Sequence, residues 1–190
     1  MILEVVKYGH PVLRQKGARV EKINAEITKL IADMLETMHA AKGVGLAAQQ
    51  IGQALQLTVL DVSGATDRPS TFTRNGKEED INTVMPLILI NPEIKLTGEN
   101  IVGSEGCLSF PEIFGEISRP AMAEVKATNE KGEKIEFLCG GLLSRAVQHE
   151  LDHLNGILYI DRMTRAEKDE LKAELEELQA QTKAELKAKK

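Results

Sequence analysis

The sequence predicts an α+β fold, in which antiparallel strands pack around one buried helix and a second helix covers the outside. Two observations predict this class. Residues 25–41 and 141–156 carry apolar side chains at helical spacing. Residues 123–127 and 135–139 instead alternate apolar and polar side chains on either side of a turn at 129–132, as the strands of a hairpin do. With 190 residues, 42% of them hydrophobic, the chain can build such a core without disulfide or metal support.

The composition excludes several other classes of protein. The 24 Lys and Arg residues against 29 Asp and Glu give a net charge of −5, which leaves no basic face for DNA. The longest apolar run, Val84 to Ile90, is interrupted by Pro86 and is too short to span a membrane. The opening Met1–Lys7 lacks the regions of a signal peptide. We therefore expect a cytoplasmic protein with reduced thiols, because two cysteines are too few for a disulfide scaffold.

The first half of the chain contains one helix and one strand with clear signals. The helix is predicted from about Ala25 to Ala41, with Asn24 as its N-cap and Gly43 at its end. The segment from Gly43 to Gly52 then shows neither a helical nor a strand period. A strand is expected over Leu57–Val62, where apolar residues dominate.

A polar segment separates this strand from the next one. Residues 63–84 contain Gly, Pro, Asn and a charged cluster, and we expect a surface insertion there, longer than most loops. The apolar run Leu87–Ile90 predicts a buried strand, which Asn91-Pro92 should close.

The second helix is expected to be largely buried, because its apolar residues occupy more than one face between Gly141 and Gly156.

The chain is expected to form one domain over residues 1–164, followed by a tail. The tail, residues 165–190, carries equal numbers of acidic and basic residues, with acids early and lysines late, which favours a helix. Whether this helix is merely solvated or docks on something stays open at this point.

The segment with the strongest chemical signal is Gln148–His153. On a helix, His149 and His153 project from one face, so both rings can bind one metal ion. Glu150 stands next to the first histidine and can take a proton from the attacking water. The alternative is a pair of hydrogen-bonded core histidines without a metal.

A third ligand decides between these interpretations. Metzincin-type proteases place a further histidine six residues after the second one, where this chain has Tyr159. Cys107 is the better candidate, because a thiolate and two imidazoles leave the fourth tetrahedral position to water. Such a mixed donor set suits zinc. Cys139 alternates with apolar residues on one strand face and is expected to be an inert buried thiol.

Three segments together resemble the signature motifs of the peptide deformylase family. They are Gly43–Gln50, Glu105–Ser109 and Gln148–His153, in the family's order and with similar spacing. The stretch Gly9–Arg14 is similar to the family's usual opening, and the resemblance extends over about residues 2–163.

The resemblance implies an enzyme that removes the formyl group from the N-terminal formyl-methionine of new polypeptides and releases formate. It implies that Cys107, His149 and His153 bind the metal, which in the family is usually Fe²⁺, with Zn²⁺, Ni²⁺ or Co²⁺ also accepted. It further implies that Glu150 acts as the catalytic base, while the Gln50 side chain and the Leu108 backbone N–H stabilise the oxyanion.

By the same resemblance, five residues bind the substrate: Gly43, Val44, Gly45, Leu142 and Ala146. Arg145 and Phe114 depart from residues found in some members, which concerns peptide recognition and leaves the chemistry unchanged. The expected partners are N-formyl-methionyl nascent peptides, and in some members a C-terminal helix contacts the ribosome. We expect a monomer that binds neither DNA nor a membrane.

Two other functions remain compatible with parts of the sequence. A different metallopeptidase would explain the helix with His149 and His153, although the Cys107 motif argues against it. A non-catalytic domain with a structural metal is the second alternative. Structural zinc sites usually have four protein ligands, and the sequence offers no convincing fourth.

Overall fold

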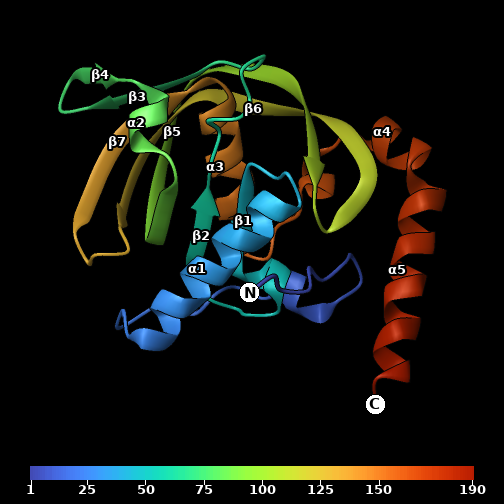
Figure 1. Cartoon of the computed structure of the whole chain (residues 1–190). Helices are drawn as coiled ribbons and strands as arrows, with labels where there is room; N and C mark the ends of the chain where they lie inside the picture. Colours follow the sequence, from blue (N-terminus) through green and yellow to red (C-terminus); the bar gives the residue numbers. More distant parts are fainter.

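The fold is described here for residues 1–190 from a computed structural model (Figure 1). The strands are β1 (Gly45–Ala47), β2 (Leu57–Leu60), β3 (Ser70–Arg74), β4 (Lys77–Glu79), β5 (Leu87–Cys107), β6 (Phe110–Thr128) and β7 (Lys134–Gly140). The α-helices are α1 (Ala25–Ala40), α2 (Ile81–Val84), α3 (Gly141–Leu154), α4 (Arg165–Glu170) and α5 (Lys172–Ala188). Three short 3-10 helices complete the chain: η1 (Pro11–Arg14), η2 (Ala48–Ile51) and η3 (Tyr159–Arg162). None of the helices combines the length and apolar character that crossing a membrane requires.

All seven strands form one antiparallel sheet, in the order β1-β2-β5-β6-β7-β3-β4. The sheet curves around α3, which contacts strands from both of its halves (Figure 1). Every residue of α3 from Leu142 to Leu154 is buried, so this helix is enclosed by the sheet on several sides. The predicted α+β class with antiparallel strands is confirmed.

Two elements predicted from sequence periods are present. The hairpin of β6 and β7 pairs Ala123 with Cys139 and Val125 with Phe137, as the alternation indicated. Helix α1 begins after Asn24, whose side-chain oxygen accepts the backbone N–H of Ile27. This helix packs its apolar face on β1 and β2 and leaves the other face exposed.

Strand β5 is much longer than the sequence predicted. Asn91-Pro92 does not close it, because the pairing with β6 shifts register between Ile90 and Glu93 and then continues to Cys107. Proline lacks the N–H that a sheet ladder needs, and a bulge accommodates it without ending the strand. The consequence is that Cys107 lies at the end of a long β-ribbon.

The segment at 63–84 also contains more structure than an irregular surface insertion. Strands β3 and β4 form a hairpin whose turn, Asn75-Gly76, has positive φ at both residues. Strand β3 pairs with β7, and Phe72 is buried against Phe137 with stacked rings. The insertion therefore extends the sheet and adds to the core.

The tail forms α4 and α5 and packs on the rest of the chain. Leu175 is buried in an apolar cluster with Val12, Leu13 and Ile160. In Figure 1, α5 runs along one side of the molecule, distant from α3. The tail is thus docked on its own domain on one face and solvated on the other.

Candidate metal centre

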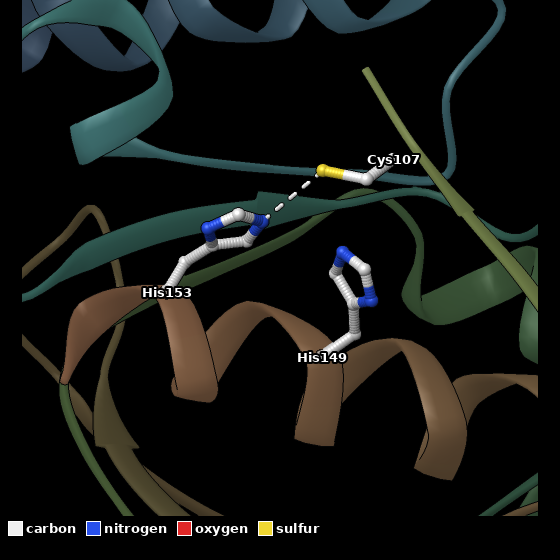
Figure 2. A group of neighbouring side chains, drawn as sticks. All are labelled: Cys107, His149 and His153. Atoms are coloured by element: carbon white, nitrogen blue, oxygen red, sulfur yellow. Dashed lines mark hydrogen bonds between the residues drawn. The ribbon is translucent and has the colours of Figure 1, made fainter. Parts of the chain in front are cut away.

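Helix α3 and the end of β5 bring together three side chains that could bind a metal ion. His149 and His153 lie on adjacent turns of α3, with ring centroids 5.1 Å apart, and both point toward Cys107 (Figure 2). The Cys107 sulfur lies 3.4 Å from His153 Nε2. One donor atom from each residue lies within 4.8 Å of the other two. A thiolate and two imidazole nitrogens at this spacing fit a transition-metal ion with an open coordination position.

Glu105 fixes the orientation of the His149 ring. Its carboxylate oxygen lies 2.9 Å from His149 Nδ1, which leaves Nε2 free to face the metal position. Burial alone would raise the pKa of Glu105, but hydrogen bonds from His149 and Arg119 hold it far below its ordinary value. Glu105 is therefore ionised at neutral pH and lies behind a candidate metal-binding histidine.

A buried network of charges surrounds this carboxylate. Arg119 donates to both oxygens of Glu105, at 2.6 and 2.9 Å, and Arg145 donates to one of them at 2.8 Å. Arg119 also donates to Asp152, which Arg162 binds with two nitrogens. This network was not predicted from the sequence. The available signal was the presence of Arg145 and Asp152 in a helix predicted to be largely buried, because buried charges require partners.

Glu150 lies beside the three donors and has an unpaired oxygen. The side chain is buried, and its Oε2 atom has no hydrogen-bond partner. Burial raises the pKa of Glu150 to about 7. Gly45 of β1 makes room for it, because a Cβ atom at that position would lie 2.5 Å from Glu150 Oε1. A buried, unpaired carboxylate with this pKa is suited to exchange a proton with a ligand.

Gln50 places an amide near the same point. Its Oε1 accepts the backbone N–H of Ala47 at 2.9 Å, which fixes the direction of the Nε2 donor. That nitrogen lies 3.4 Å from the Cys107 sulfur and 3.3 Å from Ser109 Oγ. The amide nitrogen therefore lies next to the candidate metal position, and Gln50 is buried, with 1% of its surface exposed.

The N-terminal segment holds these parts in place. Val6 donates its N–H to the Gln50 carbonyl at 2.8 Å, and Tyr8 donates to the Ser109 carbonyl at 3.0 Å. Between them, Lys7 Nζ donates to the Leu108 carbonyl at 3.2 Å. One short extended stretch thus binds both segments that carry the candidate oxyanion donors.

A cavity of about 640 Å³ opens above the donors. All five predicted substrate-binding residues line it, together with most of the predicted metal-binding and catalytic residues: Gly43, Val44, Gly45, Leu142, Ala146, Gln50, Cys107, Leu108, His149 and Glu150. His153 lies beneath the cavity and is 1% exposed.

The remaining cysteine and histidines have structural contacts elsewhere. The Cys139 thiol is buried and donates to the Ala123 carbonyl, and burial raises its pKa to about 12. His39 pairs with Asp61 at 2.8 Å, and His10 caps η1 through its Nδ1 atom. None of them approaches the group of three donors.

Known proteins similar to this chain share one description. Residues 2–169 match the polypeptide deformylase family. A peptide deformylase of Methylacidiphilum infernorum is 44% identical over 178 residues, covering 94% of this chain and 93% of that protein. One of Opitutus terrae is 41% identical, covering 97% and 96%. A peptide deformylase of Synechococcus elongatus, solved in complex with actinonin, superimposes with a TM-score of 0.77 at 38% identity, covering 90% of this chain and 85% of that one.

Proposed function

This chain belongs to the peptide deformylase family, and on that premise we propose which residues carry out its reaction. The enzyme removes the N-formyl group from newly made polypeptides. The observation that supports our assignment most directly is the convergence of Cys107, His149 and His153 beside the unpaired carboxylate of Glu150. We assign α3 as the central helix that carries the metal motif.

Cys107, His149 and His153 would hold one divalent cation. Bound there, it supplies Lewis-acid polarisation of the formyl oxygen and acidifies a neighbouring water. Fe²⁺ is our first assignment, on family resemblance, and the donor set also accepts Zn²⁺, Ni²⁺ or Co²⁺.

Glu150 transfers a proton from the attacking water to the leaving amine. Its unpaired Oε2 takes a proton from the attacking water as the water oxygen bonds to the formyl carbon. When the carbon–nitrogen bond breaks, Glu150 returns that proton to the leaving amine, so that formate and a free N-terminus result. The pKa of about 7 suits both directions of transfer near neutral pH.

Gln50 and Leu108 stabilise the oxyanion of the tetrahedral intermediate. The Gln50 amide is already oriented by Ala47, and the backbone N–H of Leu108 follows Cys107 directly. Prearranged donors of this kind lose little energy to reorganisation during the reaction.

The cavity accommodates the formyl-methionine itself. Gly43 and Gly45 leave their backbone open to an extended peptide. Val44, Leu142 and Ala146 supply an apolar wall for the methionine side chain. The natural partner is therefore a nascent chain that still begins with formyl-methionine.

We propose further that residues 1–164 form the catalytic domain and that residues 165–190 are an appendage. Every candidate site residue comes from the first part, and one chain completes the site, which supports a monomer. The outer, charged face of α5 is the candidate surface for a transient ribosome contact. We place the enzyme in the cytoplasm, because the Cys107 ligand must remain reduced.

The test is formate release from formyl-Met-Ala-Ser by the wild type and by Glu150→Gln, each loaded anaerobically with Fe²⁺ or Zn²⁺. Glu150→Gln should retain the metal and lose at least about 10²-fold in kcat, the usual contribution of a general base. Cys107→Ala is the matched variant, which should lose the metal itself. A Glu150→Gln enzyme near the wild-type rate would exclude Glu150 as the base, and a folded, metal-loaded wild type without turnover would contradict the proposed function.

A further inference from the structure

The insertion at 63–84 carries one side chain into the cavity wall. Arg68 precedes β3, lines the cavity, and donates through Nη2 to the Ser104 carbonyl of β5 at 3.3 Å. It forms no ion pair, whereas Arg74 of the same insertion is bound by Glu79 through two nitrogens. An arginine that donates to only one carbonyl has its other guanidinium N–H groups available for a further acceptor.

Two more cations without an acidic partner line the same cavity. Lys42 lies in the turn between α1 and β1, and Lys7 reaches the cavity from the N-terminal segment, where its ammonium donates a hydrogen bond to the Leu108 carbonyl. Neither forms an ion pair with an acidic side chain. Together with Arg68, they bring three positive charges from three distant parts of the sequence to one cavity.

The carboxylates of the cavity do not offset these cations. Glu105 is already bound by two arginines and His149, and Glu150 is buried beneath the opening. Glu112 is the one further carboxylate in the wall. Among the cavity side chains that form no ion pair, the cations therefore outnumber the exposed carboxylate, although the chain as a whole has a net charge of −5. Such a local reversal of sign raises the local concentration of anionic ligands.

The wall of the same cavity is also partly apolar. Phe114 lines the cavity although its side chain is 64% exposed. Its ring lies against Gly106, where a Cβ atom would be 2.7 Å from Phe114 Cε1. An aromatic ring at the opening reduces access of water to a bound peptide and strengthens the ion pairs formed there.

We propose that Arg68, assisted by Lys42, recognises the carboxylate of an aspartate or glutamate in one of the two residues that follow formyl-methionine in the substrate. This inference rests on the proposed function, because it concerns the part of the nascent chain that extends from the formyl group out of the cavity. A guanidinium fork matches a carboxylate with two parallel hydrogen bonds. The insertion thus contributes substrate selectivity as well as sheet structure.

The experiment uses C-terminally amidated peptides, so that the side chain is the only carboxylate, and compares formyl-Met-Glu-Ser with formyl-Met-Gln-Ser, and formyl-Met-Ala-Glu-Ser with formyl-Met-Ala-Gln-Ser. At one of these positions, the wild type should prefer glutamate by about two- to fivefold in kcat/KM, which is the range of a partly exposed ion pair. The preference should appear mainly in KM and should shrink in 0.5 M salt because that contact is screened. The deformylated products should show the same order as competitive inhibitors.

Arg68→Gln should abolish the preference and leave the hydrolysis of formyl-Met-Ala-Ser amide unchanged. Lys77→Gln is the matched control, since Lys77 is an exposed cation of the same insertion that does not line the cavity. Arg68→Lys should retain part of the preference. Equal rates for glutamate and glutamine peptides at both positions would overturn the proposal, and so would a preference that survives Arg68→Gln. Absence of hydrolysis with formyl-Met-Ala-Ser amide, which carries no charge, would instead count against the proposed function.

Discussion

At the scale of single residues, the site depends on a carboxylate that binds no metal. Glu105 accepts hydrogen bonds from His149 and from two buried arginines, so its charge is compensated on every side. Removing one member of a buried charge network leaves the others unpaired, which costs more than the pair itself contributes. Glu105 therefore connects the stability of the fold to the geometry of the metal site.

We expect Glu105→Gln to lower the free energy of unfolding by about 3–5 kcal/mol, because Arg145 loses its only carboxylate partner and Arg119 loses one of its two. Metal affinity should fall by about 10- to 100-fold, since the His149 ring loses its charged acceptor. Denaturant titration and metal competition measure the two effects. Glu136→Gln is the control: its pair with Lys126 is exposed at 3.7 Å, and less than about 1 kcal/mol should be lost. Equal losses in both variants would show that burial of the network is unimportant.

The protonation of Glu150 gives a second prediction at this scale. Burial raises its pKa from 4.5 in the unfolded chain to about 7 in the folded one. A group whose pKa is raised by folding contributes stability that is present below the unfolded pKa and lost as the pH rises through the folded one. The free energy of unfolding of the metal-free wild type should therefore decline between about pH 4.5 and 7, relative to Glu150→Gln.

Denaturant titrations of both metal-free proteins across this pH range test the sign. The difference between the two proteins isolates Glu150, because the neighbouring histidines titrate in both. A difference that grows in favour of the wild type as the pH rises would contradict a raised pKa. In the metal-loaded enzyme a nearby cation favours the carboxylate, so the acidic limb of kcat/KM should lie at or below about pH 7.

At the scale of secondary-structure elements, β1 can pack closely against α3 because Gly45 has no side chain. Gly45 lies where a Cβ atom would be 2.5 Å from Glu150 Oε1 and 2.8 Å from Glu150 Cγ. We expect Gly45→Ala to displace Glu150 and reduce kcat by about 10²-fold, the effect of roughly 1 Å of misplacement, with the metal retained. Gly64→Ala is the control, because no atom lies within 4 Å of its added Cβ. A Gly45→Ala enzyme with the wild-type kcat would show that the base tolerates this shift.

The elements that were predictable from the sequence are those with one buried face. Helix α1 and the hairpin of β6 and β7 show a clear period because their side chains divide between the core and the solvent-exposed surface. Beyond Asn91, most of β5 is exposed on both faces, so it has no alternation to detect. The hairpin of β3 and β4 did carry a signal, the Asn75-Gly76 dipeptide, which was outweighed by the polar composition around it.

The same distinction applies to the candidate site. Cys107, His149 and His153 could be selected because ligand chemistry needs specific residue types, two of which lie four positions apart on a helix. The partners of Glu105 come from β6 and α3, and only the folded sheet brings them together. Ion pairs between distant residues leave no local period, which explains why this network was missed.

At the scale of the whole molecule, the two ends of the chain support the site together. Helix α5 packs on the N-terminal segment, and Gly9 approaches it so closely that a Cβ atom would lie 2.8 Å from the Gln179 carbonyl oxygen. The residues just before Gly9 bind the carbonyls of Gln50 and Leu108. A change in the packing of the tail can therefore displace residues 6–9, and with them the segments that carry the proposed oxyanion donors.

Leu175→Ala tests this connection. Leu175 is 6% exposed in a cluster that includes Val6 and Tyr8, so its truncation should cost about 2–4 kcal/mol of unfolding free energy. Looser packing of the N-terminal segment should also lower kcat by a few fold, roughly 1 kcal/mol of transition-state stabilisation, while KM and metal content stay the same. Leu186→Ala is the control, as it removes a leucine of α5 outside that cluster. If Leu175→Ala loses stability but retains the full kcat at a temperature where it is folded, the tail braces the fold without positioning the oxyanion donors, and the domain formed by residues 1–164 is catalytically independent of it.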